Sequence, residues 1–237
     1  MRVVHWENPG AKATILLFPG RTEYCEKYGR VARDLLTEGY TVLGIDWRGQ
    51  GLSDRVTDDE RVGHVTNFVD YQMDVACFLE QADALGLPEE RYMLAHSMGG
   101  CIAMRALVDG SMTPKRAVFS APMWGIFIAP VKSPMAWVLP TLAERFGQEL
   151  RTVPGTRPDS YIGDTPFLIN LLSSDRDHYD FITRHAAARP EFALGGPTIH
   201  WFAQARAEMS ALLRAPRPDI PCATFVGTNE FVVDPEA

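Results

Sequence analysis

The amino-acid sequence predicts an α/β fold: a mostly parallel, doubly wound sheet with an inserted helical cap. The first 122 residues alternate short apolar runs, which are typical of buried strands, with longer stretches of helical periodicity. From residue 123 to about residue 218 this alternation stops, and one strand-like run then returns at 222–226. Strands that are separated by helices lie parallel in one sheet, so these patterns favour a doubly wound architecture.

Residues that start or stop regular structure delimit each predicted element. Strands are predicted at residues 14–18, 41–45, 92–95, 116–120 and 222–226, and helices at residues 24–38, 68–85 and 100–109. Pro19 and Gly20 end the first strand, and Gly39 ends the first helix because glycine readily adopts the left-handed conformation that follows helices. Gly86 and Pro88 end the second helix, since proline cannot continue it.

Residues 123–218 lack strand alternation and are punctuated by proline. The prolines in this segment include Pro130, Pro134, Pro140, Pro154, Pro158, Pro166, Pro190 and Pro197. Because a structureless loop of this length is unusual, we expect short helices that form a cap inserted into the fold. The predicted organisation is therefore a first core part at 1–122, the cap at 123–218, and the continued core at 219–237.

The predicted cap is rich in aromatic and aliphatic side chains, which have two interpretations. The residues concerned are Trp124, Ile126, Phe127, Ile128, Met135, Trp137, Phe167 and Leu168. They could line an apolar channel for an acyl chain, because ligand cavities are lined mainly by such side chains. Taken one by one, most of them are more simply explained as the cap's own small core.

Composition narrows the class of protein and of partner. With 237 residues the chain can bury roughly 70% of its unfolded surface, which suits one sizeable domain. The net charge of −7, without a basic cluster, argues against nucleic acid or an anionic membrane surface as the main partner. The four cysteines are scattered without a C-x-x-C pair, which favours reduced thiols over disulfides or a zinc site. No apolar run has membrane-spanning length and residues 1–6 are no signal peptide, so we expect a cytoplasmic location.

The strand at 92–95 ends abruptly in a serine that is surrounded by small residues. The sequence there is YMLAHSMGG, with Ser97 between Ala95 and Gly99. It resembles the nucleophile elbow G-x-S-x-G of α/β-hydrolases, in which a strained strand-to-helix turn exposes a serine hydroxyl. Ala95 occupies the first glycine position, where a methyl group is tolerable. We therefore identify Ser97 as the candidate nucleophile; an ordinary serine in a strand-to-helix loop is the alternative.

Five motifs along the chain carry a wider resemblance. In order they read FPGR, DWRGQGLSD, AHSMGG, SAPM and GTNEFVVD. Together they are similar to the monoacylglycerol lipase and lysophospholipase branch of the α/β-hydrolase superfamily. The resemblance implies a serine hydrolase that cleaves a carboxylic ester with one long acyl chain through an acyl-enzyme, under a helical cap. It also implies a small-molecule lipid ester as partner, no cofactor, and at most peripheral membrane contact through the cap.

The oxyanion that forms when Ser97 attacks an ester needs backbone N–H donors. In this fold one donor is the residue after the nucleophile, here Met98. The other comes from the turn Pro19-Gly20-Arg21, which resembles the family's His-Gly-x turn. Proline has no N–H, so we expect Arg21 to donate and keep Gly20 as the reserve. The Arg21 side chain has two interpretations: a surface salt bridge, which we favour, or a contact with a lipid phosphate in the pocket.

The acid of the triad should follow the returning strand, because the members occur in the chain order serine, acid, histidine. Glu230 in the turn GTNE is our prediction, and Asp234 is the alternative, which more simply bonds a neighbouring turn. No histidine follows Glu230, whereas the resemblance places the base after one more helix and strand. Residues 1–6 are likewise similar to the second strand of an opening hairpin whose first strand is missing. We therefore expect a fragment of a longer hydrolase that lacks its catalytic histidine.

The histidines that are present are expected to be structural. They are His5, His64, His96, His178, His185 and His200. His96 adjoins Ser97, but consecutive residues of an extended segment point in opposite directions. His178 and His185 lie near aspartates, yet their spacing matches no standard ligand set, so we expect no metal site.

Three functions are open at this point. The leading hypothesis is hydrolysis of a lysophospholipid or a monoacylglycerol. A lipid-binding pseudoenzyme of the same fold is the second, because a serine without a base is poorly activated. The third is an amide or peptide hydrolase; the segment of the predicted cap that is rich in tryptophan and methionine favours acyl chains over it.

Overall fold

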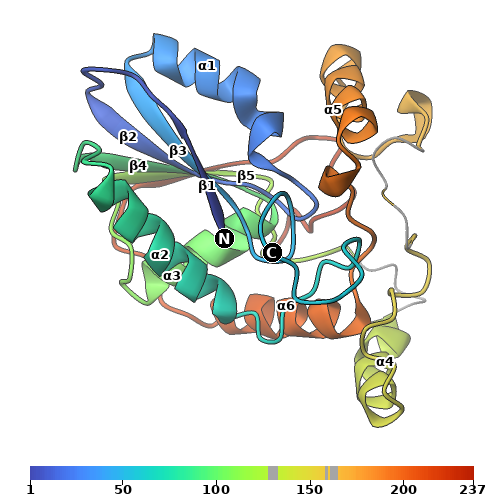
Figure 1. Cartoon of the computed structure of the whole chain (residues 1–237). Coiled ribbons are helices and arrows are strands. Elements are labelled where there is room, and N and C mark those ends of the chain that lie inside the picture. The colour runs from blue at the N-terminus through green and yellow to red at the C-terminus, as the bar shows by residue number, and fades with distance from the viewer. Residues whose placement is uncertain (128–132, 158–159, 161–164) are drawn as a thin grey trace.

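The structure is a computed structural model that describes residues 1–127, 133–157, 160 and 165–237 (Figure 1). Within these residues, six strands form one sheet: β1 (Arg2–Trp6), β2 (Ala13–Phe18), β3 (Tyr40–Asp46), β4 (Arg91–His96), β5 (Arg116–Ser120) and β6 (Cys222–Phe225). Their order across the sheet is β1-β3-β2-β4-β5-β6. Strand β1 runs antiparallel to β3 and the other pairs are parallel. The mostly parallel sheet predicted from the sequence is therefore confirmed.

Helices cover the sheet on both faces. The described helices are η1 (Cys25–Tyr28), α1 (Gly29–Thr37), α2 (Asp70–Ala84), α3 (Met98–Val108), α4 (Ser133–Arg145), η3 (Phe167–Ile169), α5 (Arg176–Ala188), η4 (Pro190–Phe192) and α6 (Ile199–Leu212). Figure 1 shows α1 on one face of the sheet and α2, α3 and α6 on the other. The helix expected at 24–38 begins as a separate 3-10 turn, and the helix expected at 100–109 begins earlier, at Met98.

The side-chain alternation along β2 divides the core into two clusters. Leu16 and Phe18 pack on the side of α2, α3 and α6, in the larger cluster. Ile15 and Leu17 point to the other side, in a smaller cluster with residues of η1 and α1. A strand that is buried on both faces reads as a continuous apolar run, which is why residues 14–18 are recognisable in the sequence. Each of these side chains contributes about 2 kcal/mol by leaving water.

Helix α6 arises from the segment predicted as the cap, yet one side of it belongs to the main core. Trp201, Ala205 and Met209 are buried in the same cluster as the residues of β2 and α3. Helices α4 and α5 lie to one side of the sheet instead (Figure 1). Pro140 was expected to interrupt a helical stretch, but it lies inside α4. The cap boundaries at 123 and 218 stay a prediction.

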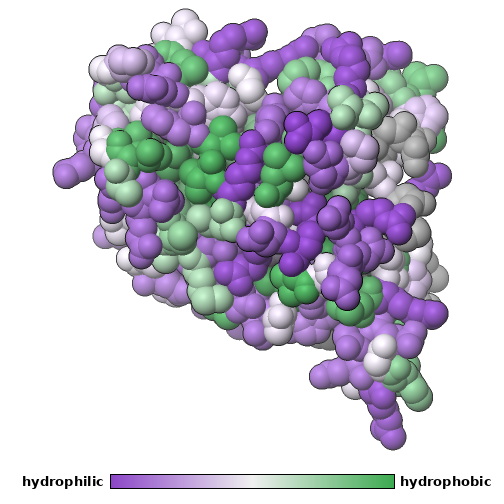
Figure 2. Space-filling view, in the orientation of Figure 1, coloured by the Kyte–Doolittle hydropathy of each residue, from purple (hydrophilic) through white to green (hydrophobic). Residues whose placement is uncertain are grey.

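The surface and the helix lengths bear on possible membrane contact. None of the helices in the described ranges is both long and apolar enough to cross a bilayer. On the face shown in Figure 2, hydrophilic side chains surround scattered hydrophobic ones. The described segment around η3 is an apolar exception, with Leu168 91% exposed and Ile169 68% exposed.

Candidate active site

Ser97 occupies a strained turn between β4 and α3. Its backbone has φ 50° and ψ −119°, a conformation that a non-glycine residue adopts only when its surroundings enforce it. The backbone is also closely packed two residues later: a Cβ on Gly99 would lie 2.5 Å from the carbonyl oxygen of Pro19, and still closer to that of Phe18. Backbone atoms cannot move aside cheaply, so glycine is required at 99. Ala95 is fully buried without such a conflict, which explains the alanine in the first glycine position of the motif.

Backbone hydrogen bonds fix the serine at the carboxyl edge of the sheet. The Ser97 N–H donates to the carbonyl of Ser120 at 3.1 Å, and the Ser97 carbonyl accepts from Met123 N at 2.9 Å. Ser120 ends β5, so the elbow is tied to the neighbouring strand. The Ser97 hydroxyl has no hydrogen-bond partner within the described part of the chain. The backbone thus holds the side chain in place, and no described residue engages its hydroxyl.

Two backbone amides are available near this hydroxyl. Met98 is the first residue of α3, so its N–H has no acceptor within the helix. Gly20 comes close enough that a Cβ on it would lie 3.1 Å from the Ser97 Cβ, which places the turn beside the nucleophile. The Gly20 N–H donates to Glu23 Oε2 at 2.5 Å and is therefore occupied. The N–H groups of Arg21 and Met98 have no acceptor among the residues that the structure describes, which favours Arg21 over Gly20 as the second donor.

Glu23 is a buried carboxylate that the sequence analysis missed. Besides the Gly20 amide, it accepts the Tyr28 hydroxyl at 2.5 Å and pairs with the Lys27 ammonium. Burial alone would raise the pKa of Glu23, but the charges of Lys27 and His96 and the hydrogen bonds from Lys27 and Tyr28 outweigh burial and lower it to about 2. Glu23 therefore stays ionised and holds the Gly20 turn. In the sequence, only the position of Glu23, three residues after Gly20, could have indicated that it holds this turn.

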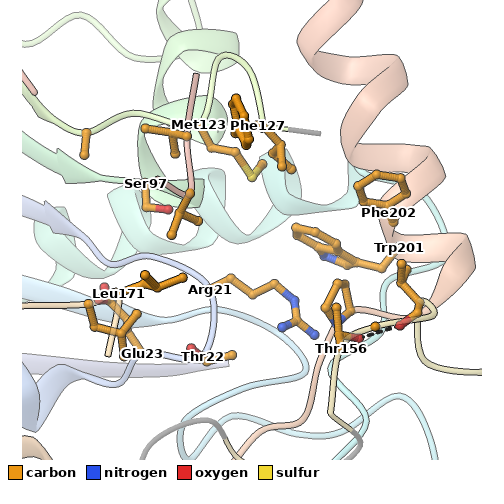
Figure 3. Close-up of a pocket in the computed structure, with 18 of the residues that line it drawn as sticks. Arg21, Thr22, Glu23, Ser97, Met123, Phe127, Thr156, Leu171, Trp201 and Phe202 are labelled. Atoms are coloured by element: carbon orange, nitrogen blue, oxygen red, sulfur yellow. Dashed lines mark hydrogen bonds between the residues drawn. The ribbon is translucent and has the colours of Figure 1, made fainter. Parts of the chain in front are cut away.

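The Arg21 side chain extends along the cavity rather than over the surface. In Figure 3 it runs from beside Ser97 to a position under Trp201 and next to Thr156. Its η nitrogens donate to the carbonyls of Gly195 at 3.0 Å and Gly63 at 3.5 Å, and its guanidinium carbon lies 4.9 Å from the centre of the Trp201 ring. Burial lowers the pKa of Arg21 to about 10. The surface salt bridge favoured from the sequence is wrong, because Arg21 makes no ion pair with any described residue.

Glu230 lies in the wall of the same cavity as Ser97, whereas Asp234 does not. The Glu230 Oε1 accepts hydrogen bonds from Val232 N at 2.7 Å and Val233 N at 3.0 Å, which closes a tight turn after β6. Asp234 is exposed, and its carboxylate accepts from the amide of Glu236. Of the two acids weighed from the sequence, the structure brings Glu230 to the nucleophile's cavity.

None of the six histidines, all of which the structure describes, is hydrogen-bonded to Ser97 or Glu230. His96 reaches the cavity, but its Nδ1 lies 2.9 Å from the Ser120 carbonyl and its Nε2 lies 3.7 Å from Glu23. The others have partners elsewhere: His5 with Thr41, His64 with Thr198, His200 with Thr66, and His178 and His185 with Phe181 on α5. The described residues thus contain a nucleophile and a candidate acid but no histidine that joins them.

The cavity beside Ser97 has a volume of about 610 Å³ and a largely apolar wall. Its apolar lining includes Met123, Ile126, Phe127, Leu139, Val153, Leu171, Leu172, Trp201, Phe202, Val232 and Val233. Of the acyl-channel residues expected from the sequence, Ile126 and Phe127 line it. Trp124, Phe167 and Leu168 do not; Trp124 packs on Phe119 and Phe167 on Tyr179. Ile128 and the side chains of Met135 and Trp137 lie outside the described residues.

Comparisons with known proteins agree with this geometry. A family model described as "Serine aminopeptidase, S33" matches residues 9–237. Lysophospholipase L2 of Escherichia coli K12 is 37% identical over 206 residues, which cover 85% of this chain and 58% of that protein. A probable lysophospholipase L2 of Haemophilus influenzae is 30% identical over 222 residues, which cover 93% of this chain and 68% of that protein. The chain thus spans little more than half the length of the Escherichia coli relative.

Solved structures show the same fold at lower identity. A monoacylglycerol lipase of Paleococcus ferrophilus matches with a TM-score of 0.68 and 20% identity, over 99% of this chain and 80% of that one. A soluble variant of monoglyceride lipase from Saccharomyces cerevisiae matches with a TM-score of 0.66 and 21% identity, over 99% and 75%. The family match covers nearly the whole chain and includes the elbow, strands β2 to β6 and the Glu230 turn. The chain therefore belongs to the α/β-hydrolase family that this model describes.

Proposed function

We propose that this protein is a serine hydrolase that cleaves the carboxylic ester of a monoacyl lipid, either a lysophospholipid or a monoacylglycerol, through an acyl-enzyme on Ser97. One observation carries the proposal: a serine in a strained elbow opens into an apolar cavity of about 610 Å³ beside two amides that lack acceptors. This volume is in the usual range for small-molecule sites. Each methylene of an acyl chain that leaves water there contributes about 0.8 kcal/mol.

The geometry supports a division of roles. The Ser97 hydroxyl oxygen attacks the ester carbonyl while a general base takes its proton and later passes it to the leaving alcohol, and the amides of Met98 and Arg21 donate to the oxyanion. Removal of one such donor typically costs about 3 kcal/mol of transition-state stabilisation. The alcohol then leaves and water hydrolyses the acyl-Ser97 ester. Glu230 orients the general base, which must be supplied by a group other than the six histidines of residues 1–237.

An aminopeptidase activity is the second candidate, because the matching family model carries that description. An aminopeptidase needs an unpaired carboxylate to bind the substrate's α-ammonium group. The carboxylates in the described cavity wall are Glu23, which Lys27 and Tyr28 occupy, and Glu230, whose Oε1 accepts from the amides of Val232 and Val233 and whose charge the proposed mechanism uses to orient the base. The Arg21 cation in the same wall repels an ammonium group. The lipid ester is therefore the better fit.

The test is covalent labelling of the intact protein with a fluorophosphonate probe. We expect one adduct, located on Ser97 by mass spectrometry. Ser97→Ala should abolish it, and Ser174→Ala, which removes an exposed hydroxyl, should leave it unchanged. Absence of a Ser97 adduct would refute the proposed hydrolase function. If the unlabelled protein still binds a monoacyl ether lipid, the lipid-binding pseudoenzyme is the correct description.

A substrate panel separates the two hydrolase candidates. Release of fatty acid from a lysophosphatidylcholine and from a monoacylglycerol should exceed cleavage of aminoacyl p-nitroanilides at equal concentrations. The reverse order would identify an amide hydrolase that uses the same serine.

A further inference from the structure

One cation in the cavity wall forms no ion pair with any residue that the structure describes. The described lining residues with formal charge are Arg21, Glu23, Lys27 and Glu230. Lys27 is paired with Glu23, and Glu230, whose Oε1 accepts from two backbone amides, makes no ion pair with Arg21. Arg21 contacts two carbonyl groups and an aromatic ring, all of them neutral. The cavity therefore holds one guanidinium that no described carboxylate neutralises.

Burial of this guanidinium lowers the stability of the folded protein. The Arg21 Nε is buried and has no hydrogen-bond partner among the described residues. Removal of a charge from water costs several kcal/mol unless an opposite charge and further hydrogen bonds offset it. Even with the pKa lowered to about 10, Arg21 stays protonated at neutral pH. A guanidinium that is retained at such a place is best explained by an anion that it binds.

The position of Arg21 relative to Ser97 specifies which anion. In Figure 3, Met123 and Phe127 lie on one side of Ser97 and the Arg21 side chain leads away on the other. The Arg21 guanidinium carbon is five bonds from its Cα, which is about 6 Å in an extended side chain. In a 1-acyl lysophospholipid, the phosphorus is six bonds from the ester carbonyl carbon, which is about 7 Å. A substrate whose ester sits at the Arg21 amide therefore places its phosphate near the guanidinium.

We propose that Arg21 binds the phosphate of the head group and thereby makes lysophospholipid, rather than monoacylglycerol, the preferred substrate of the site at Ser97. This inference rests on the proposed function. The planar guanidinium matches phosphate oxygens better than an ammonium does. Trp201, Gly63 and Gly195 hold the side chain in place, so the site is built before the ligand arrives.

Equilibrium binding of ether lipids, which have no ester to cleave, tests the role of Arg21 independently of catalysis. The ligands are 1-O-dodecyl-glycero-3-phosphocholine and 1-O-dodecyl-glycerol, each below its micellar concentration, and inorganic phosphate alone. Arg21→Gln should weaken binding of the phosphate-containing ether about 10- to 100-fold and leave the neutral ether within twofold. Arg21→Lys should keep part of the preference, and Arg116→Gln, an exposed arginine on β5, should change nothing.

Each outcome decides the inference. Equal weakening of both ethers by Arg21→Gln would show that Arg21 merely fastens the loops at Gly63 and Gly195, and would overturn it. No loss for either ether, or equal loss of preference in Arg21→Lys and Arg21→Gln, would overturn it as well. Binding of inorganic phosphate as tight as that of the phospholipid ether would assign the site to free phosphate instead of the head group. All these results can occur while Ser97 still reacts with a fluorophosphonate, so they do not depend on the same measurement as the hydrolase.

Discussion

The elbow at Ser97 and the turn at Glu230 face one cavity but are built in opposite ways. The elbow is embedded: Met98, Gly99 and Gly100 are buried. The carbonyl of Phe18 in β2 lies against Gly99, and the carbonyl of Ser120 in β5 accepts a hydrogen bond from Ser97 N. The Glu230 turn follows β6, whose four residues are all exposed, and it is closed by amides two and three positions along the chain. One wall of the site depends on distant packing, and the other on a short local turn.

The difference follows from what each residue must do. Ser97 needs a backbone conformation that costs of order 1–3 kcal/mol, and such a conformation persists only where the surrounding core over-determines it. Glu230 has ordinary backbone requirements, so two local hydrogen bonds suffice to position it. Substitutions on the elbow side should therefore lower stability, and substitutions on the Glu230 side should lower activity alone.

The largest effect is expected on the Glu230 side. Glu230→Gln keeps an oxygen that accepts from Val232 and Val233, so the turn should persist and the free energy of unfolding should change by less than about 0.5 kcal/mol. An amide in place of a triad carboxylate leaves the base wrongly oriented and lowers kcat about 10³- to 10⁴-fold. The measurement is kcat of the intact protein on a lysophospholipid, with urea denaturation alongside.

Asp234→Asn is the matched control for this substitution. Its side chain is exposed and bonds a neighbouring amide, so kcat should stay within twofold of wild type. If Asp234→Asn lost activity and Glu230→Gln kept it, Asp234 would be the triad acid in place of Glu230. A large loss of stability in Glu230→Gln would contradict the contrast between the two walls.

Next in size is Gly99→Ala on the elbow side. The added methyl group meets the carbonyl oxygens of Phe18, the last residue of β2, and of Pro19, which accepts a hydrogen bond from Trp47 Nε1. We expect a loss of about 3 to 4 kcal/mol in the free energy of unfolding, measured by urea denaturation. Gly29→Ala is the control, because a Cβ there meets nothing within 4 Å and Gly29 already has helical φ and ψ. It should be neutral or stabilising by up to about 1 kcal/mol. Equal effects at the two positions would refute the packing argument.

Glu23→Gln removes the carboxylate behind the Gly20 turn and leaves Lys27 unpaired. The pKa of Glu23 is about 2 in the folded protein against an ordinary 4.5, so its ionisation stabilises the fold above pH 4.5 and this contribution is lost as pH falls toward 2. We expect Glu23→Gln to be less stable than wild type by roughly 3 kcal/mol at pH 7 and by much less near pH 2, in urea denaturation at both pH values.

The exposed pair of Glu90 and Lys115 provides the control for Glu23. Glu90→Gln breaks an ion pair that lies in water, so it should change the free energy of unfolding far less than Glu23→Gln does at pH 7, and by a similar small amount at both pH values. A Glu23→Gln variant whose deficit is the same at both pH values would show that the carboxylate does not stabilise the turn through its charge.

What the sequence could predict follows the same division between local and distant structure. The strands and the elbow were predictable, because a continuous apolar run and a small residue such as Gly99 are local signals. The burial of Arg21 was not, since its partners Gly63 and Gly195 lie 42 and 174 residues away in the chain. Helix α6 lies in the segment predicted as the cap, because the sequence of the helix alone does not indicate that Trp201 packs into the main core. Glu23 resembled an ordinary acid at the start of a helix.

The smallest effect is expected for Ala95→Gly, which restores the glycine of the elbow motif. Ala95 is fully buried in β4 and its methyl group meets no conflict, so its loss removes packing and adds unfolded-state entropy. We expect a cost of about 1 kcal/mol in urea denaturation and an unchanged rate of fluorophosphonate labelling at Ser97. Ala103→Gly, at a buried position in α3, should cost a similar amount. A gain of stability in Ala95→Gly would mean that the methyl group strains the elbow; a loss without change in labelling means that Gly99 alone imposes the shape on which Ser97 depends.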